Sequence, residues 1–438
     1  MIIEQHYDDE VLIDLLEEAE EDTHVPVCDT CTGTLQSYRD LSSALHDNSV
    51  WDERELSETA KPETTNFLRA FADRTRAEDA AASAIVPKLI ANPALIDPHP
   101  EWRTAGVVRG LLAIVDDKNF TEPKVAAEIA ALAVQVADSL EAGQYPFDTV
   151  TKLRGKAWRT HAHMLYYVGS YNESIKALDR ADDLLQACSV SEYDLARAQV
   201  VRAQLYNELE RLDEAVTLAD SASTTFRKFE DIDREALAEA TKAASLVGAR
   251  RYGEALPVFM RLGADRRIAD KPRAFYIHNA AICSRELSRF EESKSLFVQA
   301  VAEFERLGLV SARARARWHL AQVMLDEHHY EQSRALLIEL RNDFEELGMP
   351  QDVALTCVDE AEASLMLGQL AEVVRLCQRA MEYFSKASIA YTQGALTALA
   401  YLKEAAEGRT LTKQTLGDLR SYFELLPQQP HLLFAYPV

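Results

Sequence analysis

The chain has 438 residues, and its 71 acidic and 47 basic side chains give it a formal net charge of −24. A surface that binds nucleic acid needs clustered lysine and arginine, so this charge argues against nucleic acid as the main ligand and favours protein partners with basic surfaces. With only 15 glycines and 14 prolines, turn-rich β folds are disfavoured and long helices are expected.

The negative charge is concentrated at the N-terminus. Residues 1–60 hold 17 acidic side chains and only two basic ones, Arg39 and Arg54, which gives this segment a net charge of −15. The start, MIIEQHYDDE, has neither the basic nor the apolar region of a secretory signal, and no apolar run is long enough to span a bilayer. We therefore expect a cytoplasmic protein with two electrostatically different regions.

The first elements in chain order are two short helices, predicted over residues 8–21 and from about residue 23 to residue 45. The first has an apolar stripe at helical spacing. Residues 46–63 are polar and acidic, which is typical of a linker. A longer helix is predicted over residues 64–90, and the proline-rich stretch 92–100 then breaks the helical pattern.

From residue 101 onward the sequence repeats with a period of about 40 residues. Six segments share an aromatic residue or leucine, which is preceded nine residues earlier by alanine and followed three residues later by a small residue or valine. These six marker residues are Tyr171, Leu212, Tyr252, Phe290, Tyr330 and Leu370. Small residues at such offsets let two helices approach closely, and helix pairs that cannot bury their own apolar faces must stack.

This pattern resembles the tetratricopeptide repeat. The resemblance covers about residues 153–385, with a weaker additional pair at about 101–143 and closing helices at about 389–406 and 413–426. The period is longer than that family's repeat of about 34 residues, which implies longer helices or longer turns. The glycine-rich turn of the family is also degraded in several of the repeats.

The strongest local motif is an HxxxCxxC sequence formed by His24, Cys28 and Cys31. On a helix these residues share one face, where an imidazole and two thiolates supply three corners of a tetrahedral Zn²⁺ site. His6, just before the first predicted helix, is the candidate fourth ligand, and the set then predicts a closed, structural site. A redox switch, in which oxidation of the thiolates ejects the metal, is an alternative reading.

Residues 4–46 resemble the zinc-binding anti-sigma domain, through the leading histidine, the HxxxCxxC motif and the amphipathic helix that follows. The resemblance implies that His6, His24, Cys28 and Cys31 bind Zn²⁺ and that the domain binds a sigma factor, with the helix at 64–90 as a further contact. The gap between His6 and His24 is shorter than expected for the family. The alternative is a structural zinc knuckle in an interaction scaffold unrelated to transcription.

In tetratricopeptide arrays the first helix of each pair lines the concave face. The residues of this chain at the corresponding inward positions are basic and aromatic, which predicts a groove that suits an acidic peptide. One such peptide is the chain's own N-terminal segment. The alternative is an ordinary solvated helix face. The predicted groove residues are Arg159, His163, Tyr166, Tyr167, Arg197, Gln204, Asn207, His278, Arg285, Arg315, Trp318 and Gln322.

No sequence motif for catalysis is present: HExxH, the P-loop, GxGxxG and GxSxG are all missing. We therefore do not expect an enzyme. The resemblance to the anti-sigma domain implies a transcription regulator with a sigma factor as one partner, and the predicted groove implies a second protein or peptide. The expected fold is all-α, a small zinc-stapled helical domain followed by a tetratricopeptide-like α-solenoid. The expected domains are 1–46 (zinc), 47–100 (linker and connecting helix), 101–388 (solenoid) and 389–438 (C-terminal cap and tail).

Overall fold

The computed structural model describes residues 62–119, 122–141, 145–189 and 191–386, together with residues 408, 414, 418 and 422. These residues form fifteen α-helices and two short 3₁₀ helices, and none of them forms a strand. The α-helices are α3 (Pro62–Ala91), α4 (Ala105–Lys118), α5 (Pro123–Asp138), α6 (Phe147–Tyr167), α7 (Tyr171–Gln186), α8 (Glu192–Glu208), α9 (Leu212–Lys228), α10 (Ile232–Gly248), α11 (Tyr252–Ala264), α12 (Asp270–Glu286), α13 (Phe290–Arg306), α14 (Val310–Asp326), α15 (Tyr330–Glu346), α16 (Pro350–Met366) and α17 (Leu370–Lys386).

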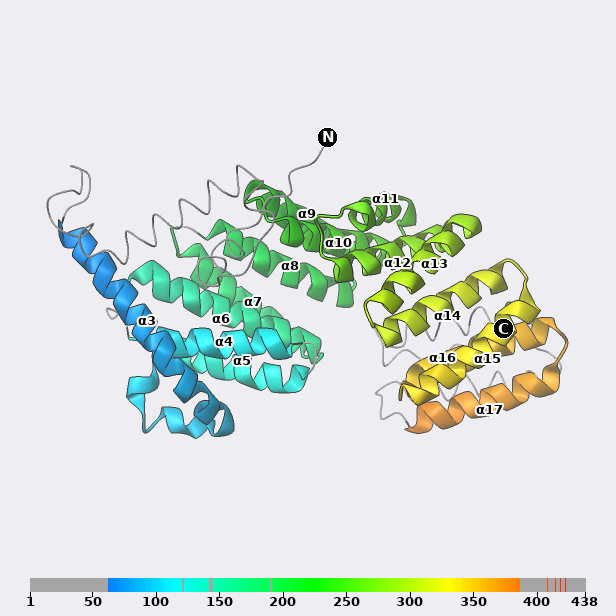
Figure 1. Cartoon of the computed structure of the whole chain (residues 1–438), viewed down its shortest axis with the longest axis horizontal. Coiled ribbons are helices and arrows are strands. Elements are labelled where there is room, and N and C mark those ends of the chain that lie inside the picture. Colours follow the sequence, from blue (N-terminus) through cyan, green and yellow to red (C-terminus); the bar gives the residue numbers. More distant parts are fainter. Residues whose placement is uncertain are drawn as a thin grey trace. The chain divides into compact units, whose positions relative to one another are not determined.

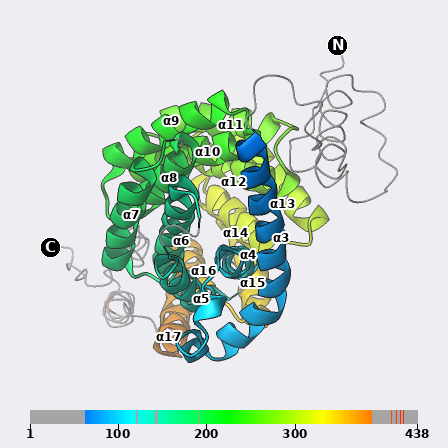
Figure 2. The same cartoon turned by 90° about the vertical axis from the view of Figure 1, so that its left-hand side faces the viewer.

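The chain divides into two compact units. Unit 1 takes the described residues up to Leu205 together with Ser221–Glu235, and unit 2 takes Tyr206–Asp220 together with the described residues from Ala236 onward. Within unit 1, α3 packs on α4, α4 on α5, and α5 on α6 (Figure 1). Within unit 2, each helix from α11 to α17 packs on the next, and α14 lies between α12 and α16 (Figure 2).

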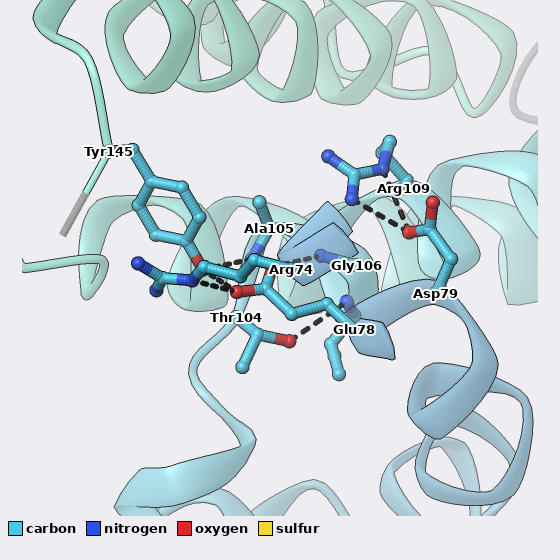
Figure 3. A network of polar contacts seen from close by, with 9 residues as sticks. Arg74, Glu78, Asp79, Thr104, Ala105, Gly106, Arg109 and Tyr145 are labelled. Carbon is cyan, nitrogen blue, oxygen red and sulfur yellow. Dashed lines mark hydrogen bonds and ion pairs between the residues drawn. The ribbon is translucent and has the colours of Figure 1, made fainter. Parts of the chain in front are cut away.

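Helix α3 is fastened to the start of α4 by a polar network (Figure 3). The Glu78 carboxylate accepts hydrogen bonds from the Tyr145 hydroxyl at 2.8 Å and from the backbone N–H of Gly106 at 3.3 Å. It therefore sits at the N-terminus of α4, where the helix dipole favours negative charge. A Cβ at Gly106 would lie 2.5 Å from the Glu78 carbonyl carbon, so the close crossing of the two helices requires glycine.

The six marker residues of the repeat each begin the second helix of a pair, because Tyr171, Leu212, Tyr252, Phe290, Tyr330 and Leu370 are the first residues of α7, α9, α11, α13, α15 and α17. The alanine nine residues before each marker is fully buried, as is the small residue or valine three residues after it. These positions are Ala162, Ala203, Ala243, Ala281, Ala321 and Ala361, and Ser174, Ala215, Ala255, Ser293, Ser333 and Val373. The sequence pattern thus identified the contact between paired helices.

Three of these small residues are serines that join the two helices of a pair directly. The Ser174 hydroxyl donates to the Ala162 carbonyl at 2.7 Å, and Ser293 and Ser333 donate to the carbonyls of Ala281 and Ala321, both at 2.8 Å. A buried hydroxyl must find a hydrogen-bond partner. Serine at this position therefore both permits the close approach and stabilises it.

The turn within each pair contains a residue in the left-handed conformation, two positions before the marker. Glycine fills this position only at Gly169 and Gly368, and the other four turns use residues with φ between 57° and 67°, namely Glu210, Arg250, Ser288 and His328. The degraded glycine pattern in the sequence therefore does not reflect a different turn. The same turn is made, at a steric cost to the residues that carry a Cβ.

The long period of the repeat follows from helix length. In unit 2, α12 to α17 each have 17 residues and are joined by connections of three residues. Two such helices and two such connections account for the whole spacing between successive markers. The departure from the shorter family repeat thus lies in longer helices, which confirms the tetratricopeptide-like α-solenoid with long repeats.

Two groups of sequence predictions fall outside the described residues. The zinc ligands His6, His24, Cys28 and Cys31 precede residue 62, and most of the predicted closing helices at 389–406 and 413–426 are likewise not described. Among the helices that are described, none is long and apolar enough to cross a bilayer.

Candidate functional site

A stripe of basic side chains runs along α6, the first helix of the first repeat. Lys152, Lys156, Arg159 and His163 are spaced four, three and four residues apart, which places them on one face of the helix. Arg159 is 5% exposed, whereas the side chains of Lys152 and Lys156 are 37% and 38% exposed. The stripe therefore has a buried centre and two cations that face solvent.

The centre of this stripe is held by one buried carboxylate, Asp194 on α8, which is 2% exposed. Its oxygens lie 3.1 Å from Lys152 Nζ, 3.9 Å from Lys156 Nζ and 3.3 Å from Arg159 Nη1. Burial by itself would raise the pKa of Asp194, but Lys156, Lys152 and Arg159 together hold this pKa below its ordinary value. One carboxylate thus forms ion pairs with three cations.

Two further arginines extend the positive charge. Arg234 at the start of α10 pairs with Asp231 at 3.3 Å, while no carboxylate of the described residues lies within ion-pair distance of Arg197 on α8. Burial lowers the pKa of the Arg197 guanidinium, and the neighbouring charge of Arg234 lowers it further. We call Lys152, Lys156, Arg159, Arg197 and Arg234 the cationic face of unit 1.

The cationic face has more positive than negative charge. The ion pairs given for its five cations go to two carboxylates of the described residues, Asp194 and Asp231, and Asp116 adds a further negative charge near Arg197. For the partly buried Lys156, burial lowers the pKa, Asp194 opposes this effect, and Arg159, Lys152 and Arg197 add to it. A bound anion would offset this repulsion, so the arrangement favours a negatively charged ligand.

Polar and aromatic groups continue the face toward the end of α6. Within the described part of the chain, His163 Nε2 and Gln204 Oε1 are buried, and the Gln204 side chain lies beside the His163 imidazole. Burial lowers the pKa of His163 to about 4, and Arg159 and Arg197 contribute to this shift. The ring of Tyr167 lies 4.8 Å from that of His163 and 5.4 Å from that of Tyr166, and Tyr167 is 38% exposed.

The first helices of unit 2 carry a different polar network. Arg285 on α12 donates from Nη1 to Gln322 Oε1 at 2.9 Å, and Gln322 on α14 donates from Nε2 to Asp359 Oδ2 on α16 at 2.9 Å. Trp318 Nε1 donates to the same carboxylate oxygen at 2.7 Å, and Arg285 Nε donates to Asp326 at 2.6 Å. We call Arg285, Gln322, Asp326, Asp359 and Trp318 the polar ladder of unit 2, because it joins three successive first helices.

Two histidines lie against this ladder. The ring centroids of His278 and His319 are 5.1 Å apart, and His319 Nδ1 lies 3.1 Å from Gln322 Oε1. Burial lowers the pKa of His278 to about 3, with a further contribution from His319, and lowers the pKa of His319 to about 4. Both rings are therefore neutral near pH 7 and pack as part of the inter-repeat contact.

The predicted groove residues thus separate into two groups. Arg159, His163, Arg197, Gln204, Tyr166 and Tyr167 belong to or border the cationic face, and on α8 the buried Asn207 Oδ1 has no partner among the described residues. Arg285, Trp318, Gln322 and His278 are engaged in or beside the polar ladder, and Arg315 pairs with Asp352 at 2.8 Å. Gln322 is 5% exposed, so its amide holds other helices together rather than facing solvent.

Four side chains that complete the cationic face were not among the predicted groove residues: Lys152, Lys156, Asp194 and Arg234. The two lysines could have been found, because with Arg159 and His163 they form a single stripe at helical spacing. Asp194 and Arg234 lie on other helices, and only the packing of those helices brings them to the stripe.

In the described part of the chain, no group of histidine, cysteine and carboxylate side chains could hold a metal ion. The described cysteines, Cys188, Cys283, Cys357 and Cys377, are all buried. Burial raises the pKa of Cys283 and of Cys357 to about 12. These thiols therefore remain protonated and act as small apolar side chains.

No protein-family model matches this sequence, and no curated protein matches it. Among solved structures, the signal-transduction ATPase PH0952 from Pyrococcus horikoshii, which has a tetratricopeptide repeat sensor, is 14% identical with a TM-score of 0.52, over 94% of this chain and 69% of that one. Aspartyl phosphate phosphatase F from Bacillus subtilis is 12% identical with a TM-score of 0.52, over 83% of this chain and 97% of that one. Identities this low show the shared fold alone: the chain is a tetratricopeptide-like helical-repeat protein.

Proposed function

We propose that this chain is a regulatory helical-repeat protein whose unit 1 binds an acidic segment of a partner protein at the cationic face. The observation that carries this proposal is the surplus of positive charge. Five cations lie near the three carboxylates of Asp194, Asp231 and Asp116, and Arg197 has no ion pair within the described residues. The name of PH0952, which describes its tetratricopeptide repeats as a sensor, is consistent with a regulatory role for this fold.

The chemistry of the face fits a peptide carboxylate better than a neutral ligand. Lys152 and Lys156 are partly exposed and can turn toward a ligand without leaving the helix surface. Charge-assisted hydrogen bonds between such cations and carboxylates are about twice as strong as neutral ones. The exposed ring of Tyr167 adds an apolar contact beside the charges, as peptide-binding surfaces commonly do.

A binding measurement on the full chain tests the proposal. The probe is a short, fluorescently labelled peptide that is rich in glutamate and contains one tyrosine. Arg197→Glu should weaken its binding at least about tenfold, which corresponds to about 1.4 kcal/mol, whereas Arg180→Glu, at an exposed position on α7, should leave it within about twofold. Equal affinities of the two variants would refute the site, and affinity should fall as salt is raised.

For the N-terminal segment, the proposed role rests on the HxxxCxxC motif. We propose that His6, His24, Cys28 and Cys31 bind Zn²⁺ and that this head binds a sigma factor, whose basic DNA-reading surface the acidic side chains would occupy. The competing proposal is a zinc knuckle that serves only to organise an interaction scaffold.

Metal analysis and co-purification separate these proposals. The full chain should contain about one zinc per molecule, and Cys28→Ser with Cys31→Ser should remove it. Co-expression with a sigma factor encoded in the same genome neighbourhood should give a complex that the double variant does not form. Zinc without any such complex would favour the scaffold, and a stoichiometry well below one would exclude the zinc site itself.

A further inference from the structure

The cationic face has a candidate ligand within its own chain. Residues 1–60 have a net charge of −15, and their densest stretch, Glu17–Asp22, holds five acidic residues among six. The residues after position 60 share the remaining −9, so no other segment of that length carries a comparable net charge. Charge complementarity therefore favours this stretch as the occupant of a face that has cations in surplus.

The place where the N-terminal segment joins the folded chain also favours Glu17–Asp22 as the ligand. The segment leads directly into α3, and α3 is fixed to α4 by the Glu78 network within unit 1 (Figure 3). A segment of this length spans up to about 200 Å when extended, so its length does not prevent contact with α6 and α8. Because the segment is covalently joined to the unit that bears the face, its effective concentration reaches about the millimolar range, and even weak charge pairing would keep it bound.

We propose that Glu17–Asp22 occupies the cationic face in the free protein and blocks it, so that the acidic segment and an external acidic partner exclude one another. This inference rests on the proposed binding function of the face. The proposed contact would also couple the two binding events, that of the zinc-motif head and that of the cationic face. A partner that displaces the segment releases the zinc-motif head to bind its own target, and binding of the head frees the face in return.

Zero-length cross-linking of the full chain tests the contact. A carbodiimide joins a lysine amine to a carboxylate only where the two groups touch, and the 3.1 Å pair of Lys152 with Asp194 provides an internal positive control. Peptides containing Glu17–Asp22 should be joined to Lys152 or Lys156. These products should be lost in Arg197→Glu and retained in Arg180→Glu.

Two results of this experiment would overturn the inference. Coupling of the lysines to Asp194 alone would show that the acidic stretch does not reach the face. In a mixture of isotope-labelled and unlabelled chains, cross-links that join the two kinds of chain would assign the contact to a second copy rather than to the same molecule.

A competition measurement gives an independent test. Neutralising Glu17, Glu18, Glu20 and Glu21 to glutamine in the full chain should tighten binding of the acidic peptide by about tenfold, because the internal competitor is weakened. The matched control removes the same charge elsewhere in the segment, through Asp47→Asn, Asp52→Asn, Glu53→Gln and Glu55→Gln, and should change affinity by less than about threefold. An equal effect of both variants would overturn the assignment to Glu17–Asp22.

The same measurement separates this inference from the function on which it rests. If the peptide binds in an Arg197-dependent manner but with equal affinity to the native and the neutralised chain, the inference fails and the binding function stands. If the peptide binds neither chain, the binding function itself fails.

Discussion

The first helices of the two units both carry networks of polar side chains but use them differently. In unit 1, Asp194 is shared among three cations, and Arg197 has no ion pair within the described residues. In unit 2, Arg285, Gln322 and Asp359 are joined by hydrogen bonds across three successive first helices, α12, α14 and α16. Polar side chains on first helices therefore add to stability where their charges balance, and a surplus of charge is what supports the proposed ligand binding by unit 1.

The physical reason is the cost of an uncompensated buried charge. A buried polar group is stable only when it has partners, and a half-satisfied network is costly. The polar ladder of unit 2 avoids this cost by closing its network on itself. Unit 1 retains the cost at Lys156 and Arg197, where burial lowers the pKa of the cations, and binding an anion would offset it.

The largest effect is expected from a substitution at the centre of the cationic face. Asp194→Ala removes the carboxylate that serves Lys152, Lys156 and buried Arg159, which should destabilise unit 1 by about 3–5 kcal/mol. Urea unfolding followed by circular dichroism measures this loss. Saturating acidic peptide should restore part of the stability and should bind the variant more tightly than the native chain. No stabilisation by the peptide would contradict the charge-surplus interpretation.

A matched change in unit 2 should behave differently. Asp359→Ala leaves the indole N–H of Trp318 and the amide of Gln322 without their shared acceptor, which should cost about 2–3 kcal/mol. The acidic peptide should give no recovery of stability. Asp359→Asn, which keeps an acceptor oxygen, is the control and should cost less than the alanine variant in the same unfolding experiment.

Acid should weaken unit 2 through its buried histidines. Burial lowers the pKa of His278 to about 3, whereas a histidine in the unfolded chain has a pKa of about 6.5. The unfolded state therefore takes up the proton first as pH falls. The stabilisation is complete above about pH 6.5 and is lost as pH falls toward 3, by about 1–2 kcal/mol between pH 7 and pH 5. His278→Phe, whose ring neighbours include Phe297 and Phe304, should flatten that slope, and unfolding midpoints across this pH range measure it.

The smallest expected effects concern the left-handed turns, which both units share. Arg250→Gly should relieve the strain of a φ of 57° and stabilise the chain by about 1 kcal/mol. Gly169→Ala should cost a similar amount for the backbone alone, since no atom lies within 4 Å of the added Cβ. Thermal unfolding midpoints should therefore move in opposite directions, and a shift in the same direction would show that side-chain contacts, not φ, decide these turns.

The repeat itself could be predicted from sequence because it depends on local spacing. The alanine and serine positions around Tyr171, Phe290 and Tyr330 are fully buried where the pattern placed the contact between paired helices. The turn position, in contrast, was concealed by side chains such as Arg250 and His328, which adopt a glycine-like φ. The preference for glycine at a left-handed position reveals a turn in the sequence only when glycine occupies that position.

The candidate site could be predicted in part. The inward positions of the family pattern found Arg159, Arg197 and His163, but they grouped these with Gln322 and Arg285, whose side chains are occupied within the polar ladder. The distinction depends on Asp194 and Asp359, which come from neighbouring repeats. Which cation meets which carboxylate is a property of helix packing, and a single repeat does not contain it.

By itself, the sequence determined that this protein is an all-α solenoid with a long repeat, because helix length, close contacts and apolar periodicity are encoded within each repeat. It also determined that the acidic charge lies in residues 1–60. The tertiary structure decided which first-helix face balances its charges and which has cations in surplus. That outcome requires side chains from successive repeats to meet, and only the stacking of the helices brings them together.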